Sequence, residues 1–197
     1  MARRRDEITD LALKGSKMVA KVLGLKMPVA GALAILIEAI GDRRAKRQFQ
    51  RLEKLVGSLV PRLERLEGGI QPPPEPDLLD EILAKAVNDE DEDKTQYYAA
   101  LVEYCVSGNR NAYQVRLLGD AIKGLTAHEI KAFAHFSKHG ALRHDIPDDL
   151  RDIFWDRVCN FGLHQRGKVH HAEYTTSLGK EFLEVCELAI SPHAKHG

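Results

Sequence analysis

The sequence predicts a mainly α-helical protein of 197 residues with one short β-hairpin near its C-terminus. Apolar residues recur at helical spacing, a proline-rich stretch interrupts them, and the last third has the order helix, helix, hairpin, helix. We therefore expect five segments: a basic helical segment at 1–67, a proline-rich linker at 68–77, an acidic helical segment at 78–123, a winged-helix-like module at 124–191 and a disordered tail at 192–197.

Composition is typical of a soluble protein, with 44% hydrophobic and 29% charged residues. The three cysteines, Cys105, Cys159 and Cys186, are odd in number and show no CxxC spacing, which favours a reducing compartment and small buried side chains. The basic start MARRR is followed by acidic and polar residues, unlike a secretory signal. We expect a cytoplasmic protein, with peripheral membrane association as an alternative.

Charge is unevenly distributed although the net charge is zero. Residues 1–71 carry 15 Lys and Arg against 8 Asp and Glu, whereas residues 72–123 carry 5 against 11. This segregation indicates either internal docking of basic on acidic parts or an anionic partner for the first third.

The most apolar stretch lies within residues 24–48, where only Glu38 is charged between Val29 and Ile40. Twelve helical residues reach about 18 Å, well short of the roughly 30 Å hydrocarbon core of a bilayer. A helix buried in protein is the first interpretation, and peripheral or conditional membrane insertion is the alternative. A basic cluster follows that suits anionic lipid, nucleic acid or a protein partner: Arg43, Arg44, Lys46, Arg47 and Arg51.

Residues 49–66 continue as a helix whose apolar side chains are spaced three and four apart. Gly57 and Pro61 weaken this helix, and Pro61 is expected to kink it. A further helix is predicted at 7–24, so we expect the first segment to form a helical hairpin or small bundle. The apolar seam suits a neighbouring helix or self-association: Phe49, Leu52, Val56, Leu59, Leu63 and Leu66.

The acidic segment 78–123 begins with two helices separated by the run NDEDED. We expect this run to be a solvated turn and helix start. It is not a convincing metal site, because it lacks the glycine and terminal glutamate of a calcium loop. Tyr97, Leu101, Tyr104 and Cys105 lie at helical spacing and are predicted to form core.

The last third has sharp helix boundaries. Thr126 and Glu129 predict a capping box, and Gly140 ends the same helix. A second helix follows Pro147, with an apolar face predicted to be buried: Leu150, Phe154, Trp155 and Val158.

A β-hairpin and a final helix complete this module. Arg166 and Gly167 predict a tight turn, and Thr176 or Ser177 caps the last helix, whose apolar face holds Leu178, Phe182, Leu183, Cys186 and Ile190. The ending Thr176, Gly179, Phe182 resembles that of many bacterial winged helices.

Binding of DNA by this module is one of the function hypotheses. The helix that would enter the major groove carries four carboxylates against Arg151 and Arg157, a handicap for contact with phosphates. The hairpin is more basic and supplies the candidate nucleic-acid contacts Arg166, Lys168, His170 and His171.

No catalytic or phosphate-binding motif occurs, so neither an enzyme nor a small-molecule substrate is predicted. Cys159, His164, His170 and His171 are the densest group of metal-ligand types, but they lack the paired spacing of a zinc site. No metal or cofactor is therefore expected.

The layout resembles bacterial proteins of the abortive infection alpha family, which are associated with defence against phage. The features that carry the resemblance are the apolar helix with Pro28 and Gly31, the Arg-rich helix ending RLERLE, the acidic helical pair and the terminal winged helix. The resemblance implies a cytoplasmic sensor or effector without a cofactor. Three hypotheses follow: a non-enzymatic interaction protein, a DNA-binding regulator, and a membrane-active effector that uses residues 18–40.

Overall fold

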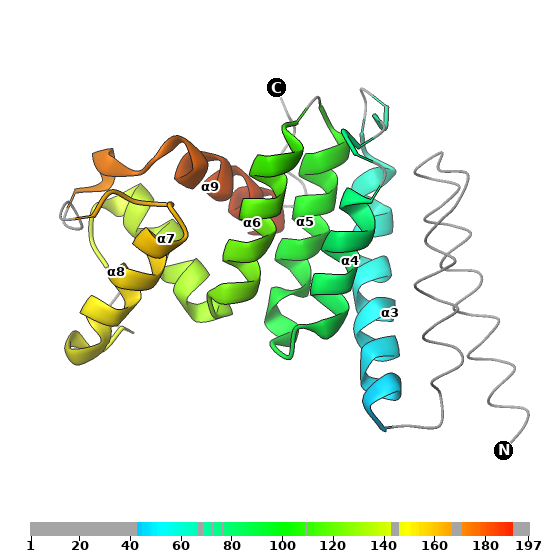
Figure 1. Cartoon of the computed structure of the whole chain (residues 1–197), viewed down its shortest axis with the longest axis horizontal. Helices are drawn as coiled ribbons and strands as arrows, with labels where there is room; N and C mark the ends of the chain where they lie inside the picture. The colour runs from blue at the N-terminus through cyan, green and yellow to red at the C-terminus, as the bar shows by residue number, and fades with distance from the viewer. Residues whose placement is uncertain are drawn as a thin grey trace, which may run out of the picture.

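A computed structural model describes residues 43–66, 69–71, 73–75, 77–108, 110–142, 146–166 and 171–190. These residues fold mainly as helices and form no strand, which confirms the predicted helical class (Figure 1). The α-helices are α3 (Arg43–Leu63), α4 (Leu78–Asn88), α5 (Thr95–Val106), α6 (Ala112–Gly124), α7 (Ala127–His139), α8 (Arg151–Asn160) and α9 (Ser177–Ile190). The short 3-10 helices are η1 (Glu92–Lys94), η2 (Asp148–Leu150) and η3 (Ala172–Tyr174).

Helix α5 is the centre of the fold, in contact with α3, α4, α6 and α9. Its residues 97–106 are all buried, so this helix needs packing partners on every side. Tyr97, Leu101, Tyr104 and Cys105 are at most 2% exposed, which confirms them as core. Because α9 packs on α5, the first and last described helices share one hydrophobic core.

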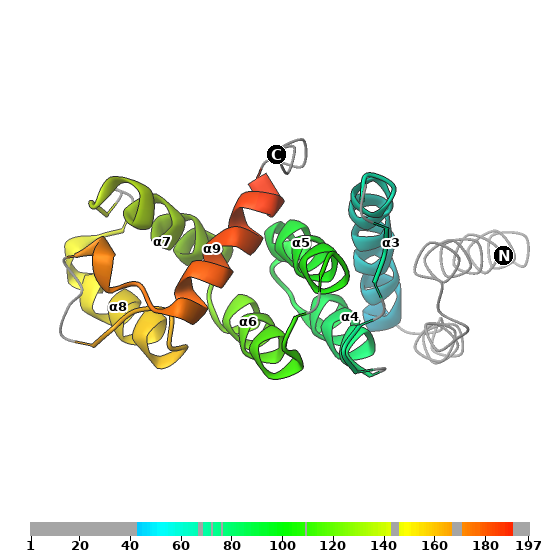
Figure 2. The same cartoon turned by 90° about the horizontal axis from the view of Figure 1, so that it is seen from above.

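The described helices form an elongated row, with α3 at one end and α8 near the other (Figures 1 and 2). Helices α3 to α6 stand side by side, whereas α7 and α8 lie beyond α6 and α9 crosses toward α5. This arrangement leaves α8 far from the basic helix α3.

The run NDEDED is mostly exposed and leads into η1, as predicted, but its Asp89 is buried in an ion pair with Lys94, the residue that follows the run. Asp89 and Lys94 are 9% and 4% exposed, and the Lys94 ammonium lies 2.7 Å from the Asp89 carboxylate. Lys94 also donates to the carbonyls of Ile122 and Lys123 at 3.1 and 3.0 Å, and Tyr98 donates to Asp89 at 2.7 Å. The run therefore ties α4 and α5 to the C-terminal end of α6.

Arg62 forms a second buried ion pair near the end of α3. Its Nη1 donates to the Glu103 carboxylate at 3.0 Å and to the Leu188 carbonyl at 2.6 Å, and its Nη2 donates to the Ala189 carbonyl at 3.2 Å. A cation at the last carbonyls of α9 also complements the dipole of that helix. One side chain thus links α3, α5 and α9.

The predicted capping box of α7 is confirmed. The Thr126 hydroxyl accepts from the Glu129 amide at 3.2 Å, and the Glu129 carboxylate accepts from the Thr126 amide at 2.7 Å. Gly140 ends the helix with a φ of 67°, a left-handed conformation that favours glycine.

Helix α9 begins at the cap that Thr176 provides. The Thr176 hydroxyl accepts from the Gly179 amide at 2.9 Å and donates to the Gly162 carbonyl at 2.6 Å. Phe182 is fully buried, and its ring centroid lies 6.2 Å from that of Phe133. The spacing of Thr176, Gly179 and Phe182 therefore serves to dock α9.

The predicted β-hairpin is not confirmed: the described residues form no strand, and one antiparallel bridge joins His164 and Thr175. Backbone hydrogen bonds extend this contact on both sides, from the Gln165 amide to the Tyr174 carbonyl and from the Thr176 amide to the Leu163 carbonyl, both at 3.1 Å. The intervening residues 167–170 lie outside the described part of the chain.

Candidate protein-interaction surface

Helix α8 is anchored by its inward face. Phe154, Trp155 and Val158 are buried, as the sequence predicted. The Trp155 ring lies edge-on to Phe136 of α7, with centroids 4.7 Å apart. Such an aromatic pair fixes the rotation of α8 about its axis and therefore determines which residues face outward.

The prediction that Leu150 is buried was wrong, because its side chain is 47% exposed. The α-helix begins one residue later, at Arg151, and the 3-10 turn Asp148–Leu150 precedes it. A 3-10 turn has about three residues per turn instead of 3.6, so Leu150 is rotated away from the buried face of α8.

Both arginines of α8 are bound to residues of this chain. The Arg157 guanidinium lies 2.9 Å from the Glu129 carboxylate and also donates to the Gly124 carbonyl. Arg151 lies 2.7 Å from the Asp148 carboxylate. Neither cation is therefore free to neutralise the remaining carboxylates of the helix.

The outward side of η2 and α8 combines apolar and acidic side chains. We call it the α8 face: Asp149, Leu150, Asp152, Ile153 and Asp156. Leu150 and Ile153 are 47% and 56% exposed and lie three residues apart, where helical side chains are neighbours. The three aspartates are exposed and have no ion-pair partner among the described residues. Large apolar groups ringed by uncompensated carboxylates are suited to a cationic, partly apolar partner.

His164 supports the α8 face from inside. The side chain is 2% exposed, and its ring lies 5.3 Å from that of Trp155 and 5.9 Å from that of Phe136. Its ring nitrogens lie 3.2 and 3.1 Å from the carbonyl oxygens of Gln165 and His171. The residue therefore joins α7, α8 and the His164–Thr175 bridge.

Two of the four candidate nucleic-acid contacts lie in the described part of the chain. Arg166 is exposed and donates to the Asn160 side chain, and His171 is exposed with its ring 5.9 Å from Tyr174. Lys168 and His170 lie outside the described residues.

The basic cluster at the start of α3 is described in part. Arg43, Arg44 and Lys46 belong to the helix, and their side chains lie outside the described part. Arg47 is exposed, whereas Arg51 is half-buried and donates to the Val87 carbonyl at 3.4 Å.

The apolar seam of α3 faces the protein's own core. Leu52, Leu59 and Leu63 are at most 7% exposed, and α3 packs on α4 and α5. Val56 and Leu66 are half-buried against the same core, and the Phe49 side chain lies outside the described part. In this conformation the three leucines are not a free surface for self-association.

No group of three or more His, Cys, Asp or Glu side chains within the described ranges is arranged to hold a metal ion. Burial raises the pKa of the Cys159 thiol, although nearby Arg166 acts in the opposite direction. Burial also raises the pKa of Cys105 to about 11. Both thiols are therefore protonated at neutral pH and are weak nucleophiles.

The part of the apolar stretch up to residue 42 lies outside the described residues. Among the helices that the structure describes, none is both long and apolar enough to cross a membrane.

The carboxylates of α8 are evident in the sequence, whereas the exposed apolar pair Leu150 and Ile153 was not predicted. The signal is present in the pattern, because Ile153 lies on the same side of the helix as Asp149 and Asp156 and away from Val158. It was overlooked because Leu150 was assigned to the buried face.

The chain was also compared with known proteins. No protein-family model matches it, and neither a curated protein nor a solved structure is similar to it at a significant level.

Proposed function

We propose that this protein is a non-enzymatic interaction protein whose α8 face binds a cationic amphipathic segment of a partner protein. The observation that carries the proposal is that both arginines of α8 form ion pairs within this chain. Arg151 and Arg157 are held by carboxylates of this chain, so the exposed side presents aspartates around Leu150 and Ile153. Burying such apolar side chains favours association, while the carboxylates select a basic partner.

We further propose that residues 124–191 form a winged-helix-like module used for protein contact. The order α7, α8, the His164–Thr175 bridge and α9 supports this reading. In such a module α8 occupies the place of the recognition helix. Fold does not determine function, and the acidic α8 face is unfavourable for contact with DNA phosphates.

The test measures binding of a fluorescent Lys/Leu amphipathic peptide by anisotropy, with the matched Glu/Leu peptide as the comparison. We expect the Lys/Leu peptide to bind more tightly, and Leu150→Ser/Ile153→Ser to weaken it by about tenfold or more. Asp149→Asn/Asp152→Asn/Asp156→Asn should weaken binding and reduce its dependence on salt.

The matched control is Tyr113→Ser, because Tyr113 is a large side chain, 68% exposed, on α6 instead of α8. This variant should bind the Lys/Leu peptide like the unmodified protein. Equal binding of the two peptides, or equal losses in the α8 and Tyr113 variants, would rule out the α8 face as the binding surface.

Binding of duplex DNA is the second candidate function, and the exposed Arg166 at the end of the bridge favours it. Its test is duplex binding at low salt by the protein and by Arg166→Ala/Lys168→Ala. Binding that the double variant loses would support this candidate, and absence of binding at low salt would end it.

From the sequence we also propose a role in phage defence and, as an alternative, a membrane-active function of the N-terminal apolar helix. Flotation of the full chain with vesicles containing anionic lipid tests the membrane function. A fraction that floats only with anionic vesicles would support it, and a protein that stays with the soluble fraction in all mixtures would contradict it.

A further inference from the structure

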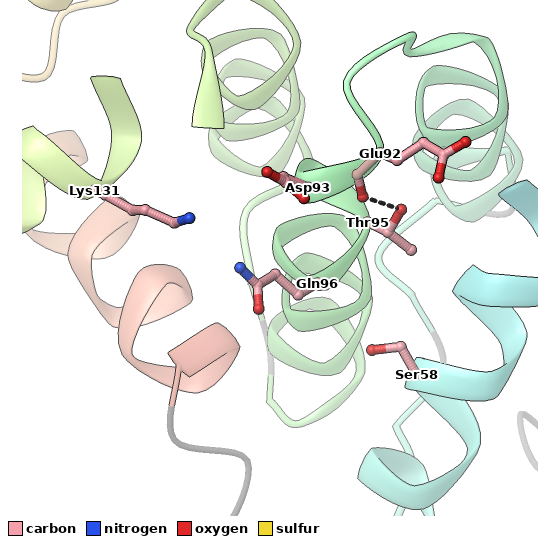
Figure 3. A pocket seen from close by; sticks show the side chains of 6 residues that line it. All are labelled: Ser58, Glu92, Asp93, Thr95, Gln96 and Lys131. Atoms are coloured by element: carbon pink, nitrogen blue, oxygen red, sulfur yellow. Dashed lines mark hydrogen bonds between the residues drawn. The ribbon is translucent and has the colours of Figure 1, made fainter. Parts of the chain in front are cut away.

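Two hollows adjoin at the start of α5, far from the α8 face in the sequence. The narrower hollow, of about 280 Å³, is lined by residues from α3, η1, α5 and α7 (Figure 3). The wider hollow, of about 630 Å³, lies between α7 and α9. Gln96 and Lys131 line both hollows, so together they form one groove, which we call the α5–α7–α9 groove.

The narrower hollow presents charges of opposite sign. Figure 3 shows the Lys131 side chain extending from α7 toward Asp93 and Gln96, which lie across the hollow. Asp93 and Lys131 form no ion pair with each other or with another described residue, whereas Glu92 pairs with Lys54. One carboxylate and one ammonium therefore face the same space, and each lacks a protein partner among the described residues.

The wider hollow adds an apolar side. Ala134, Leu183 and Cys186 line it, and Cys186 is 1% exposed. Lys138 lies on its rim, where it is 3.0 Å from the Glu187 carboxylate. Lys131, at the junction of the two hollows, is thus the lysine of the groove that remains unpaired within the described residues.

One buried hydroxyl on the lining of the wider hollow lacks a polar partner among the described residues. The Ser137 hydroxyl, on a residue that lines the wider hollow, is buried without a hydrogen bond from any described residue. A buried hydroxyl without a hydrogen bond is unfavourable, and a bound polar molecule can offset this cost.

We infer that the α5–α7–α9 groove binds a free amino acid with an apolar side chain. Its carboxylate lies at the Lys131 ammonium, its ammonium at the Asp93 carboxylate, and Gln96 contacts the polar groups between them. The side chain enters the wider hollow beside Ala134, Leu183 and Cys186. The paired charges favour a zwitterion over a fatty acid, which has no ammonium, and over an internal peptide segment, which has neither charge.

The test is isothermal titration of the full-length protein with L-leucine and L-phenylalanine. Two matched analogues each remove one charge: N-acetyl-L-leucine lacks the ammonium, and L-leucinamide lacks the carboxylate. We expect the amino acids to bind with a Kd near or below about 1 mM, and each analogue to bind about tenfold more weakly.

Two variants assign the charges. Asp93→Asn should abolish the preference for L-leucine over N-acetyl-L-leucine, and Lys131→Met should abolish the preference over L-leucinamide. Both residues are exposed, so the variants are expected to fold. Lys123→Met, at an exposed lysine of α6 outside the groove, is the matched control and should bind L-leucine unchanged.

The proposal is overturned if neither amino acid binds up to about 20 mM, which corresponds to negligible affinity. It is also overturned if N-acetyl-L-leucine or L-leucinamide binds as tightly as L-leucine. These ligand comparisons decide the matter on the unmodified protein, even if a variant fails to fold. Leu150→Ser/Ile153→Ser should bind L-leucine normally, which separates this site from the proposed partner surface.

Discussion

Arg62 shows how a single residue can have a role that its sequence position conceals. On a helical projection it falls off the apolar seam of α3, where a solvated arginine is expected. In the structure it is 3% exposed, because Glu103 and the last carbonyls of α9 supply its hydrogen bonds. These partners lie 41 and 126 or more residues away, so no local pattern could predict them.

Replacing Arg62 by methionine should strongly destabilise the protein. The change leaves the Glu103 carboxylate buried without its ion partner, which typically costs about 3–5 kcal/mol in the free energy of unfolding. Arg62→Met/Glu103→Leu removes both charges and should recover a large part of that loss. Urea unfolding of the three proteins measures these differences.

Lys54→Met is the matched control for Arg62, because Lys54 pairs with Glu92 while both side chains are more than half exposed. Removing this ion pair should change the free energy of unfolding by less than about 1 kcal/mol. If Arg62→Met were as mild as Lys54→Met, the buried ion pair would not stabilise the fold.

At the scale of elements, local signals predicted best. The α7 capping box and Gly140 were predictable because three or four neighbouring residues determine each of them. The exposure of Leu150 was not, because it depends on the 3-10 turn that precedes α8. The burial of Asp89 and Lys94 was not predictable either, since Lys94 finds its other partners on α6.

Two helical glycines offer a matched test of element packing. A Cβ at Gly179 would lie 2.0 Å from the Leu163 carbonyl oxygen and 2.7 Å from the Thr175 methyl group, whereas a Cβ at Gly57 would meet nothing within 4 Å. Gly179→Ala should therefore push α9 away from the His164–Thr175 bridge and destabilise the protein by about 1–3 kcal/mol.

Gly57→Ala, in contrast, should stabilise α3 by roughly 0.5–1 kcal/mol, because alanine loses less backbone entropy in a helix. Thermal unfolding followed by circular dichroism compares the two variants. Equal effects would show that α9 does not approach the Leu163 backbone as closely as described.

At the scale of the whole molecule, the predicted boundary between residues 123 and 124 is crossed by packing. Helix α9 contacts α5 and α6, and the Glu181 carboxylate accepts from Tyr104 at 3.2 Å and from Gln114 at 3.0 Å. The sequence shows a change of charge and pattern at that point but carries no local sign of a return contact. Contacts between segments that are distant in the sequence leave no local pattern from which they could be predicted.

Because of this return contact, the described helices should unfold together. Differential scanning calorimetry should give one transition, with calorimetric and van't Hoff enthalpies in agreement. The Val185 side chain on α9 is fully buried, so Val185→Ala should shift the entire transition to lower temperature. Two resolved transitions, of which only one moves, would mean that residues 78–123 and 124–190 are independent units.

The hydrogen bonds from Arg62 to the last turn of α9 also set the order of events during synthesis. The Leu188 carbonyl is made 126 residues after Arg62, so at 5–20 residues per second the arginine waits roughly 6–25 s for this partner on the ribosome. During that interval the leucines of α3 can pack on α4 and α5, but the guanidinium lacks its carbonyl partners on α9. The described core is thus complete only after α9 has been synthesised, and a ribosome stalled before α9 would hold an unfinished core.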